Sequence, residues 1–212
     1  MTVVGPDGRA RCAWVGDDAA SMRYHDREWG VPVSAPQAAL ESLVLETFQA
    51  GLSWRVVLAK REAFRSALHG FDPERLAACD EGDVARWMTD RSLIRHRAKL
   101  LAAIANARAF LELERNGPGL QALVTSFVSE PARRQEPRPE APAEGSRANG
   151  SRANGSRAAA SRAAARALRS RGFRYLGPSV VHAHMQATGL VPAHRPGCFR
   201  CEAQGTALEG AA

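Results

Sequence analysis

Residues 24–54 begin with Tyr24-His25-Asp26-Arg27-Glu28-Trp29-Gly30-Val31-Pro32 and end with Gln49-Ala50-Gly51-Leu52-Ser53-Trp54. Two of the four tryptophans and one of the two tyrosines lie in this stretch, with a carboxylate, Glu46, inside an otherwise apolar run. Large aromatic side chains beside a lone acid can line a pocket for a flat, electron-poor ligand. The same side chains can also form an ordinary core, and residue types alone favour the core.

The signals in and around this stretch predict helices. Pro36 suits a first helical position, and the helix that it begins runs to about Ala50, where Gly51 ends it. On this helix Glu46 falls at the flank of the apolar stripe, so it is either a pocket-edge acid or a solvated one. No segment shows the sustained period-two alternation of a half-buried strand. We therefore predict an all-α fold of eight to ten short helices, the clearest of them at 97–114.

Length and composition are those of one globular domain over residues 1–212. No apolar run approaches the ~20 residues of a membrane span, and the N-terminus lacks the pattern of a signal peptide. We therefore expect a cytoplasmic protein without a membrane partner, in which cysteine beside histidine indicates metal more than disulfide. A net charge of +7 and a pI of about 10.0 suit a polyanionic partner.

Residues 131–157 differ in composition from the rest of the chain. Proline, arginine and glutamate dominate first, and the five-residue unit Gly-Ser-Arg-Ala-Asn then repeats from Gly145 onward. Such small polar residues bury no core, so we expect a disordered linker. Six arginines and three glutamates lie between 131 and 160, which is 6 − 3 = +3 of the charge and leaves 7 − 3 = +4 elsewhere.

Two helices, expected at 158–171 and 179–188, flank the turn Gly172-Phe173-Arg174-Tyr175-Leu176-Gly177-Pro178. Helix, glycine-containing turn and helix form the outline of a helix–hairpin–helix, whose backbone N–H groups can bind a phosphate. The alternative is an ordinary helical corner. Arginines on the first helix favour DNA.

Cysteines and histidines occur near both ends of the chain. Cys12 and His25 lie near the start, and His194 and Cys198 form an H-x3-C pair near the end. Two thiolates and two imidazoles can make a closed tetrahedral zinc site. Spacing alone leaves open a competing C-x2-C formed by Cys198 and Cys201.

Six blocks of this sequence together resemble the DNA-3-methyladenine glycosylase I family. They cover most of the chain apart from the first ten residues, the linker and the last dozen. The blocks are Arg11–Trp14, Tyr24–Pro32, Gln49–Trp54, Ile94–Lys99, Arg171–Pro178 and Met185–Leu190.

The resemblance implies a helix–hairpin–helix glycosylase that flips N3-methyladenine out of alkylated double-stranded DNA and hydrolyses its glycosidic bond. It implies a structural zinc that joins the two chain ends, with Cys198 as the ligand and not Cys201. It also implies a hairpin that contacts DNA through Gly172, Arg174 and Gly177, in a protein that we expect to be a monomer. The implied zinc ligands are Cys12, His25, His194 and Cys198. The implied base-recognition acid is Glu46, with pocket aromatics at Tyr24, Trp54, Trp14 and Trp29.

The implied chemistry agrees with the residues present. A cationic base is already a good leaving group, so the pocket needs aromatic faces and a carboxylate more than a general acid. The hairpin carries no lysine for Schiff-base chemistry, so we expect an abasic product without strand cleavage. Two other classes compete. A DNA- or RNA-binding protein without activity would need neither Glu46 nor the aromatic cluster, and a zinc hydrolase would need an open metal position.

Overall fold

The structure, a computed structural model, describes residues 1–128 and 148–201, with side chains from residue 157 onward in the second range. In chain order the elements are β1 (Thr2–Val4), β2 (Ala10–Cys12), η1 (Ala13–Val15), α1 (Ala19–Arg27), α2 (Pro36–Gln49), α3 (Trp54–Ala59), α4 (Arg61–Ala67), η2 (His69–Phe71), α5 (Pro73–Ala78), α6 (Glu81–Thr89), α7 (Arg97–Asn116), α8 (Leu120–Thr125), α10 (Ala148–Arg169) and α11 (Pro178–Ala187).

The predicted helical fold is confirmed, with one small sheet added to it. Strands β1 and β2 pair antiparallel, with Thr2 opposite Cys12 and Val4 opposite Ala10. Each strand has three residues, which is too short for an alternating pattern to be recognised in the sequence. Within the described ranges, no helix is long and apolar enough to cross a membrane.

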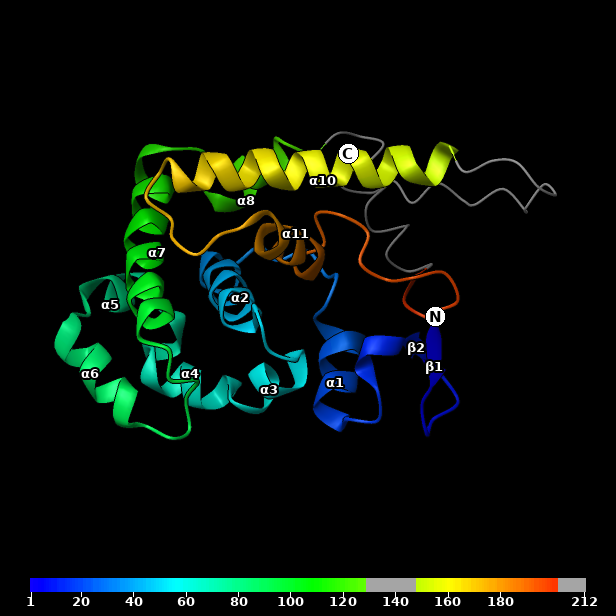
Figure 1. The fold of residues 1–212 in the computed structure, drawn as a ribbon, viewed down its shortest axis with the longest axis horizontal. Coiled ribbons are helices and arrows are strands. Elements are labelled where there is room, and N and C mark those ends of the chain that lie inside the picture. The colour runs from blue at the N-terminus through cyan, green and yellow to red at the C-terminus, as the bar shows by residue number, and fades with distance from the viewer. Residues whose placement is uncertain (129–147, 202–212) are drawn as a thin grey trace.

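Helix α2 lies at the centre of the molecule (Figure 1) and packs against α3, α7, α8 and α11. It begins at Pro36, as predicted, and it ends before Gly51, whose positive φ of 88° favours glycine. Leu40, Leu43 and Phe48 on this helix are fully buried in the main core. Because α2 is covered on several sides, even its flank is buried.

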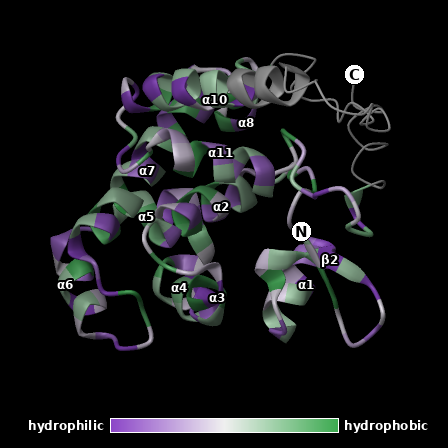
Figure 2. Ribbon diagram, turned by 45° about the vertical axis from the view of Figure 1, so that its right-hand side comes forward, coloured by the Kyte–Doolittle hydropathy of each residue, from purple (hydrophilic) through white to green (hydrophobic). Residues whose placement is uncertain are grey.

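Helices α10 and α11 pack together beside α2 and are joined by the hairpin of residues 170–177 (Figure 1). Hydrophilic and hydrophobic segments alternate along α10, as expected for a surface helix (Figure 2). Residues 131–147 of the linker predicted at 131–157 lie outside the described residues. From Ala148 the chain is helical, so α10 begins earlier than the predicted Ala158. Helix propagation costs far less than nucleation, and an alanine-rich helix can therefore extend through isolated glycines.

The two ends of the described chain meet beside α1. The backbone N–H of Phe199 donates to the carbonyl of Ala10 at 2.9 Å, and that of Gly30 donates to the carbonyl of Ala187 at 3.1 Å. Figure 1 shows the N-terminus next to the loop that follows α11. This closure brings cysteine and histidine from opposite ends of the sequence into one place.

Candidate functional site

Cys12, His25, His194 and Cys198 form a buried cluster between the two chain ends, and it could hold a metal ion. β2 ends at Cys12, α1 carries His25, and the segment after α11 supplies the other two residues. One ligand atom of each residue lies within 4.8 Å of the others. Cys201 is not a member of this group, so the structure favours the H-x3-C pair over the competing C-x2-C.

The spacing within the cluster fits a tetrahedral metal. His25 Nε2 lies 3.2 Å from His194 Nδ1 and 3.3 Å from Cys198 Sγ, and the latter two atoms are 3.5 Å apart. Zinc–nitrogen and zinc–sulfur bonds of about 2.0–2.3 Å place neighbouring tetrahedral ligand atoms about 3.3–3.8 Å apart. The four donors therefore surround a space of the right size.

Each imidazole has an acceptor on its outer side. His25 Nδ1 lies 2.8 Å from Asp26 Oδ1, and His194 Nε2 lies 3.0 Å from the carbonyl oxygen of Trp29. A carbonyl only accepts, so His194 carries its proton on Nε2 and turns the lone pair of Nδ1 inward. Arg11 in turn donates to Asp26 at 2.6 Å. Outer partners of this kind fix the orientation of metal-binding histidines.

Burial controls protonation in the cluster. It lowers the pKa of His25, and it lowers the pKa of His194 to about 4, so both rings are neutral as metal ligands must be. Burial also raises the pKa of the Cys12 thiol to about 11. A bound divalent cation would lower the pKa of this thiol, because it stabilises the thiolate.

A cavity of about 390 Å³ opens between α2, α3 and the aromatic residues near the metal cluster. Trp14 and Trp29 are edge to face, with ring centroids 5.1 Å apart. The arrangement brings three of the four predicted pocket aromatics and the predicted acid onto one cavity. The residues that line it are Trp14, Trp29, Glu46, Gln49, Ser53, Trp54, Arg55 and Ala183.

Glu46 is a buried acid and not a solvated one, with only 6% of its surface exposed. Burial raises its pKa to about 8, and no described residue offers it an ion pair or a hydrogen bond. A positively charged ligand in the cavity would lower this pKa and bind more tightly to the ionised form.

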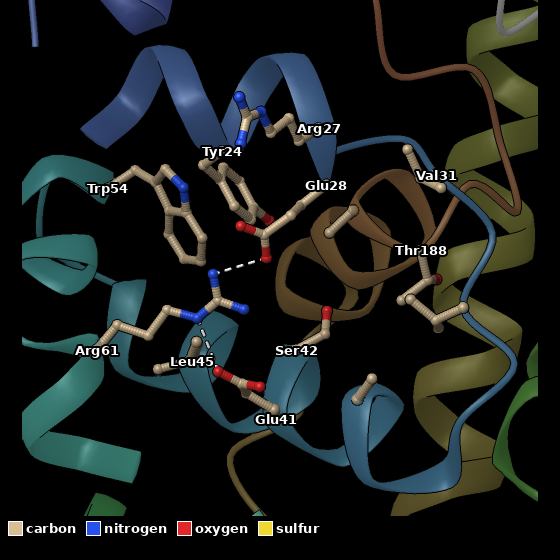
Figure 3. A pocket seen from close by; sticks show the side chains of 13 residues that line it. Tyr24, Arg27, Glu28, Val31, Glu41, Ser42, Leu45, Trp54, Arg61 and Thr188 are labelled. Carbon is tan, nitrogen blue, oxygen red and sulfur yellow. Dashed lines mark hydrogen bonds and ion pairs between the residues drawn. The ribbon is translucent and has the colours of Figure 1, made fainter. Parts of the chain in front are cut away.

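Tyr24, the fourth predicted aromatic residue, lines an adjacent cavity of about 210 Å³ that shares Trp54 with the first (Figure 3). Its ring centroid is 5.1 Å from that of Trp54. Burial and, to a smaller extent, the charge of Glu46 raise the pKa of the Tyr24 hydroxyl, which therefore stays protonated. Below the ring, Arg61 donates to Glu28 and Glu41, each at 2.7 Å (Figure 3).

The hairpin carries its three predicted DNA-binding residues at one end of the α10–α11 pair. Gly172 has a φ of 90°, Gly177 is the N-cap of α11, and Arg174 is exposed. Asn106 on α7 is fully buried and holds the turn from inside. It accepts from the Arg174 N–H at 2.7 Å and donates to the Arg174 carbonyl at 3.2 Å. Whether these residues contact DNA stays a prediction.

Sequence reasoning missed several residues that support the site. Asp26 and Arg11, beside two metal ligands, could have been found from their positions next to His25 and Cys12. Lys99 gave no comparable signal, because its partners Phe48 and Ala50 are far away in the sequence. His184 is fully buried, and its Nδ1 lies 3.2 Å from the hydroxyl of Ser42.

Comparison with known proteins agrees with this geometry. A family model described as methyladenine glycosylase matches residues 14–201. DNA-3-methyladenine glycosylase 1 of Escherichia coli (strain K12) is 42% identical over 190 residues, which are 89% of this chain and 95% of that protein. DNA-3-methyladenine glycosylase of Haemophilus influenzae is 39% identical over 195 residues, with coverages of 89% and 96%.

Solved structures are also similar. A crystal structure of 3-methyladenine DNA glycosylase I matches with a TM-score of 0.72 and 41% identity, over 89% of this chain and 98% of that one. A structure of 3-methyladenine DNA glycosylase I from Staphylococcus aureus matches with a TM-score of 0.74 and 29% identity, with coverages of 90% and 96%. The chain therefore belongs to the methyladenine glycosylase family, as its motifs indicated, and is a glycosylase.

Proposed function

We propose that the protein is a base excision repair glycosylase that removes N3-methyladenine from alkylated double-stranded DNA and leaves an abasic site. The observation that carries the proposal is the buried acid Glu46 in a cavity lined by three tryptophans. A volume of about 390 Å³ is within the range of small-molecule pockets. Relatives named for 3-methyladenine support the identity of the base.

The proposed reaction begins with extrusion of the damaged nucleotide, since its glycosidic bond is inaccessible in the stacked duplex. The cationic base then stacks on the tryptophan faces, which attract positive charge by about 1–2 kcal/mol where water is excluded. Binding of the cation favours the ionised form of Glu46, which releases its proton to solvent and then accepts a hydrogen bond from the exocyclic amino group. Water adds to the sugar carbon as the bond to the base breaks, the bonding electrons leave with the base, which departs neutral, and the water loses one proton to solvent.

The positions of the lysines support hydrolysis without strand cleavage. The whole chain has two lysines, Lys60 and Lys99, and both donate to backbone carbonyls. Neither of them lines the cavity that contains Glu46. A lyase forms a Schiff base through an accessible amine, and these side chains do not offer one there.

We propose that the metal is a structural zinc ion. Cys12, His25, His194 and Cys198 would supply all four ligands, which leaves no open position for a water nucleophile and disfavours a zinc hydrolase. The zinc would join the two chain ends and hold Trp29, whose carbonyl accepts from His194, at the cavity wall. We expect the protein to act as a monomer in the cytoplasm, with the hairpin on the DNA backbone.

The test uses the full-length protein and duplex DNA treated with a methylating agent. Chromatography of the released bases should show N3-methyladenine, and the product strand should break only after alkali. Glu46→Gln serves as the control that retains the cavity shape. Absence of N3-methyladenine release by the folded, zinc-loaded parent protein would overturn the substrate assignment. Strand breaks without alkali would overturn the proposed hydrolytic mechanism.

A further inference from the structure

The block Ile94–Lys99 marks the family, yet neither the cavity nor the metal cluster includes any of its residues. Lys99 is the unusual member, because its surface is only 7% exposed. Lysine is rarely buried to this extent unless its ammonium has partners. Its own helix does not explain its position either. Lys99 lies in the first turn of α7, where the helix dipole disfavours a positive charge.

The hydrogen-bond partners of Lys99 lie at the C-terminus of another helix, α2. Its Nζ donates to the carbonyl of Phe48 at 3.2 Å and to that of Ala50 at 2.7 Å. These carbonyls belong to the C-terminus of α2, where the last carbonyls have no partner within the helix. A cation at this end is favoured by the dipole of α2. The ammonium therefore stabilises the C-terminus of α2 and not the N-terminus of α7, the helix on which Lys99 lies.

The segment held by Lys99 connects two walls of the base cavity. Glu46 lies two residues before Phe48 and four before Ala50, whose carbonyls bind Lys99. Trp54 begins α3 four residues after Ala50. Between them, the turn is closed by its own hydrogen bonds. Leu52 N–H donates to the Gln49 carbonyl at 2.7 Å, and the Gln49 side chain donates to the Leu52 carbonyl at 3.0 Å. Lys99 thus anchors this compact turn to α7.

We propose that Lys99 is a positioning residue for the base cavity, which holds the end of α2 and the following turn so that Glu46 and Trp54 face one ligand. Its link to excision rests on the function proposed above. Substitution of Lys99 removes the ammonium donor from the Phe48 and Ala50 carbonyls and releases the turn. Displacement of a reacting group by about 1 Å can cost on the order of 100-fold in rate. The first effect of the substitution is therefore on the chemical step.

The chain offers a matched control in Lys60. Its Nζ also donates to two backbone carbonyls, those of Arg91 at 3.0 Å and Ser92 at 2.8 Å. These carbonyls belong to the loop between α6 and α7, and neither Lys60 nor that loop lines the base cavity. Lys99→Met and Lys60→Met therefore remove the same type and number of hydrogen bonds, one pair next to the cavity and one pair away from it.

The decisive measurement is the single-turnover rate of N3-methyladenine excision with saturating enzyme. A loss of folded protein alone changes the enzyme concentration needed for saturation and leaves the saturated rate unchanged. We expect the rate of Lys99→Met to fall about tenfold or more, while affinity for undamaged duplex stays within about twofold and Lys60→Met keeps the parent rate. A parent-like saturated rate for Lys99→Met would overturn the proposal.

A second measurement does not depend on catalysis. Amide hydrogen exchange of the peptide that contains residues 49–54 should become faster in Lys99→Met and stay unchanged in Lys60→Met. Unchanged exchange in Lys99→Met would overturn the anchoring role, even if the substrate assignment held. Failure of the parent protein to release N3-methyladenine would instead count against the proposed function. If Lys99→Met does not fold, Lys99→Gln, which keeps one donor, is measured in the same way and must also lose rate.

Discussion

The metal cluster and the base cavity both bury polar atoms, but they differ in how these atoms are satisfied. Both imidazoles of the cluster have an acceptor on their outer side, and Arg11 supports one of those acceptors. In the cavity, no described residue pairs with Glu46, and the buried indole N–H of Trp54 also has no partner among the described residues. A site completed by its own residues suits a permanent structural ion. A site with unpaired polar atoms suits a transient ligand.

The largest expected effect comes from a change in the metal cluster. Cys198→Ser should lose the bound zinc and lower the free energy of unfolding by on the order of 5 kcal/mol. This is the chain-entropy value for a cross-link that closes a loop of more than 100 residues. Metal analysis and denaturant titration measure the two quantities. Cys201→Ser is the control and should keep its zinc, whereas zinc loss in that variant alone would show that the ligand set is wrong.

The next effect concerns the cavity side. Glu46→Gln keeps the side-chain shape and one acceptor oxygen but removes the negative charge. We expect the single-turnover excision rate to fall about 30- to 1000-fold, which corresponds to about 2–4 kcal/mol of transition-state stabilisation. DNA affinity should be unaffected, because the hairpin is unchanged. Excision at the parent rate would show that the unpaired carboxylate has no part in the reaction.

The same substitution should have the opposite effect on stability. The pKa of Glu46 is about 8 in the folded protein, against an ordinary value of 4.5. The folded state keeps a proton that the unfolded state releases, so this group destabilises the protein as pH rises from about 5 to 8. Glu46→Gln should therefore gain stability over the parent, by on the order of 4 kcal/mol at pH 8 and about 1 kcal/mol at pH 5. Denaturant titrations at the two pH values test this, and a pH-independent difference would contradict it.

The smallest expected effect tests Asp26, which contacts the metal-binding histidine His25 from outside the cluster. Asp26→Asn weakens the acceptor that orients His25, so metal affinity should fall about 10- to 100-fold, as measured by competition with a chelator. Asp7 offers a matched control, since it also pairs with Arg11, at 2.7 Å, but among the described residues it forms no hydrogen bond or ion pair with His25. Asp7→Asn should keep the parent affinity. Equal losses in both variants would place the effect on Arg11 and not on the carboxylate–histidine contact.

Much of the helical framework was predictable from local signals. Pro36 begins α2, Asp18 caps α1 by accepting from the Ser21 N–H at 2.8 Å, and Gly51 ends α2. Caps, prolines and glycines act within a few residues of their own position, so a single sequence reveals them. The start of α10 differed from prediction because the composition of its first residues resembles that of a linker.

The sequence by itself determined the helices, the ligand types of the metal cluster and the family to which the chain belongs. Two facts depended on the tertiary structure: that Glu46 is buried, and that Lys99 holds the end of α2. The choice of Cys198 over Cys201 was implied by the family resemblance, and the cluster in the structure agrees with it. Helical periodicity left Glu46 at a flank, and only the neighbouring elements around α2 remove water from that flank. Burial and pairing depend on residues far apart in the chain, whose approach no local pattern encodes.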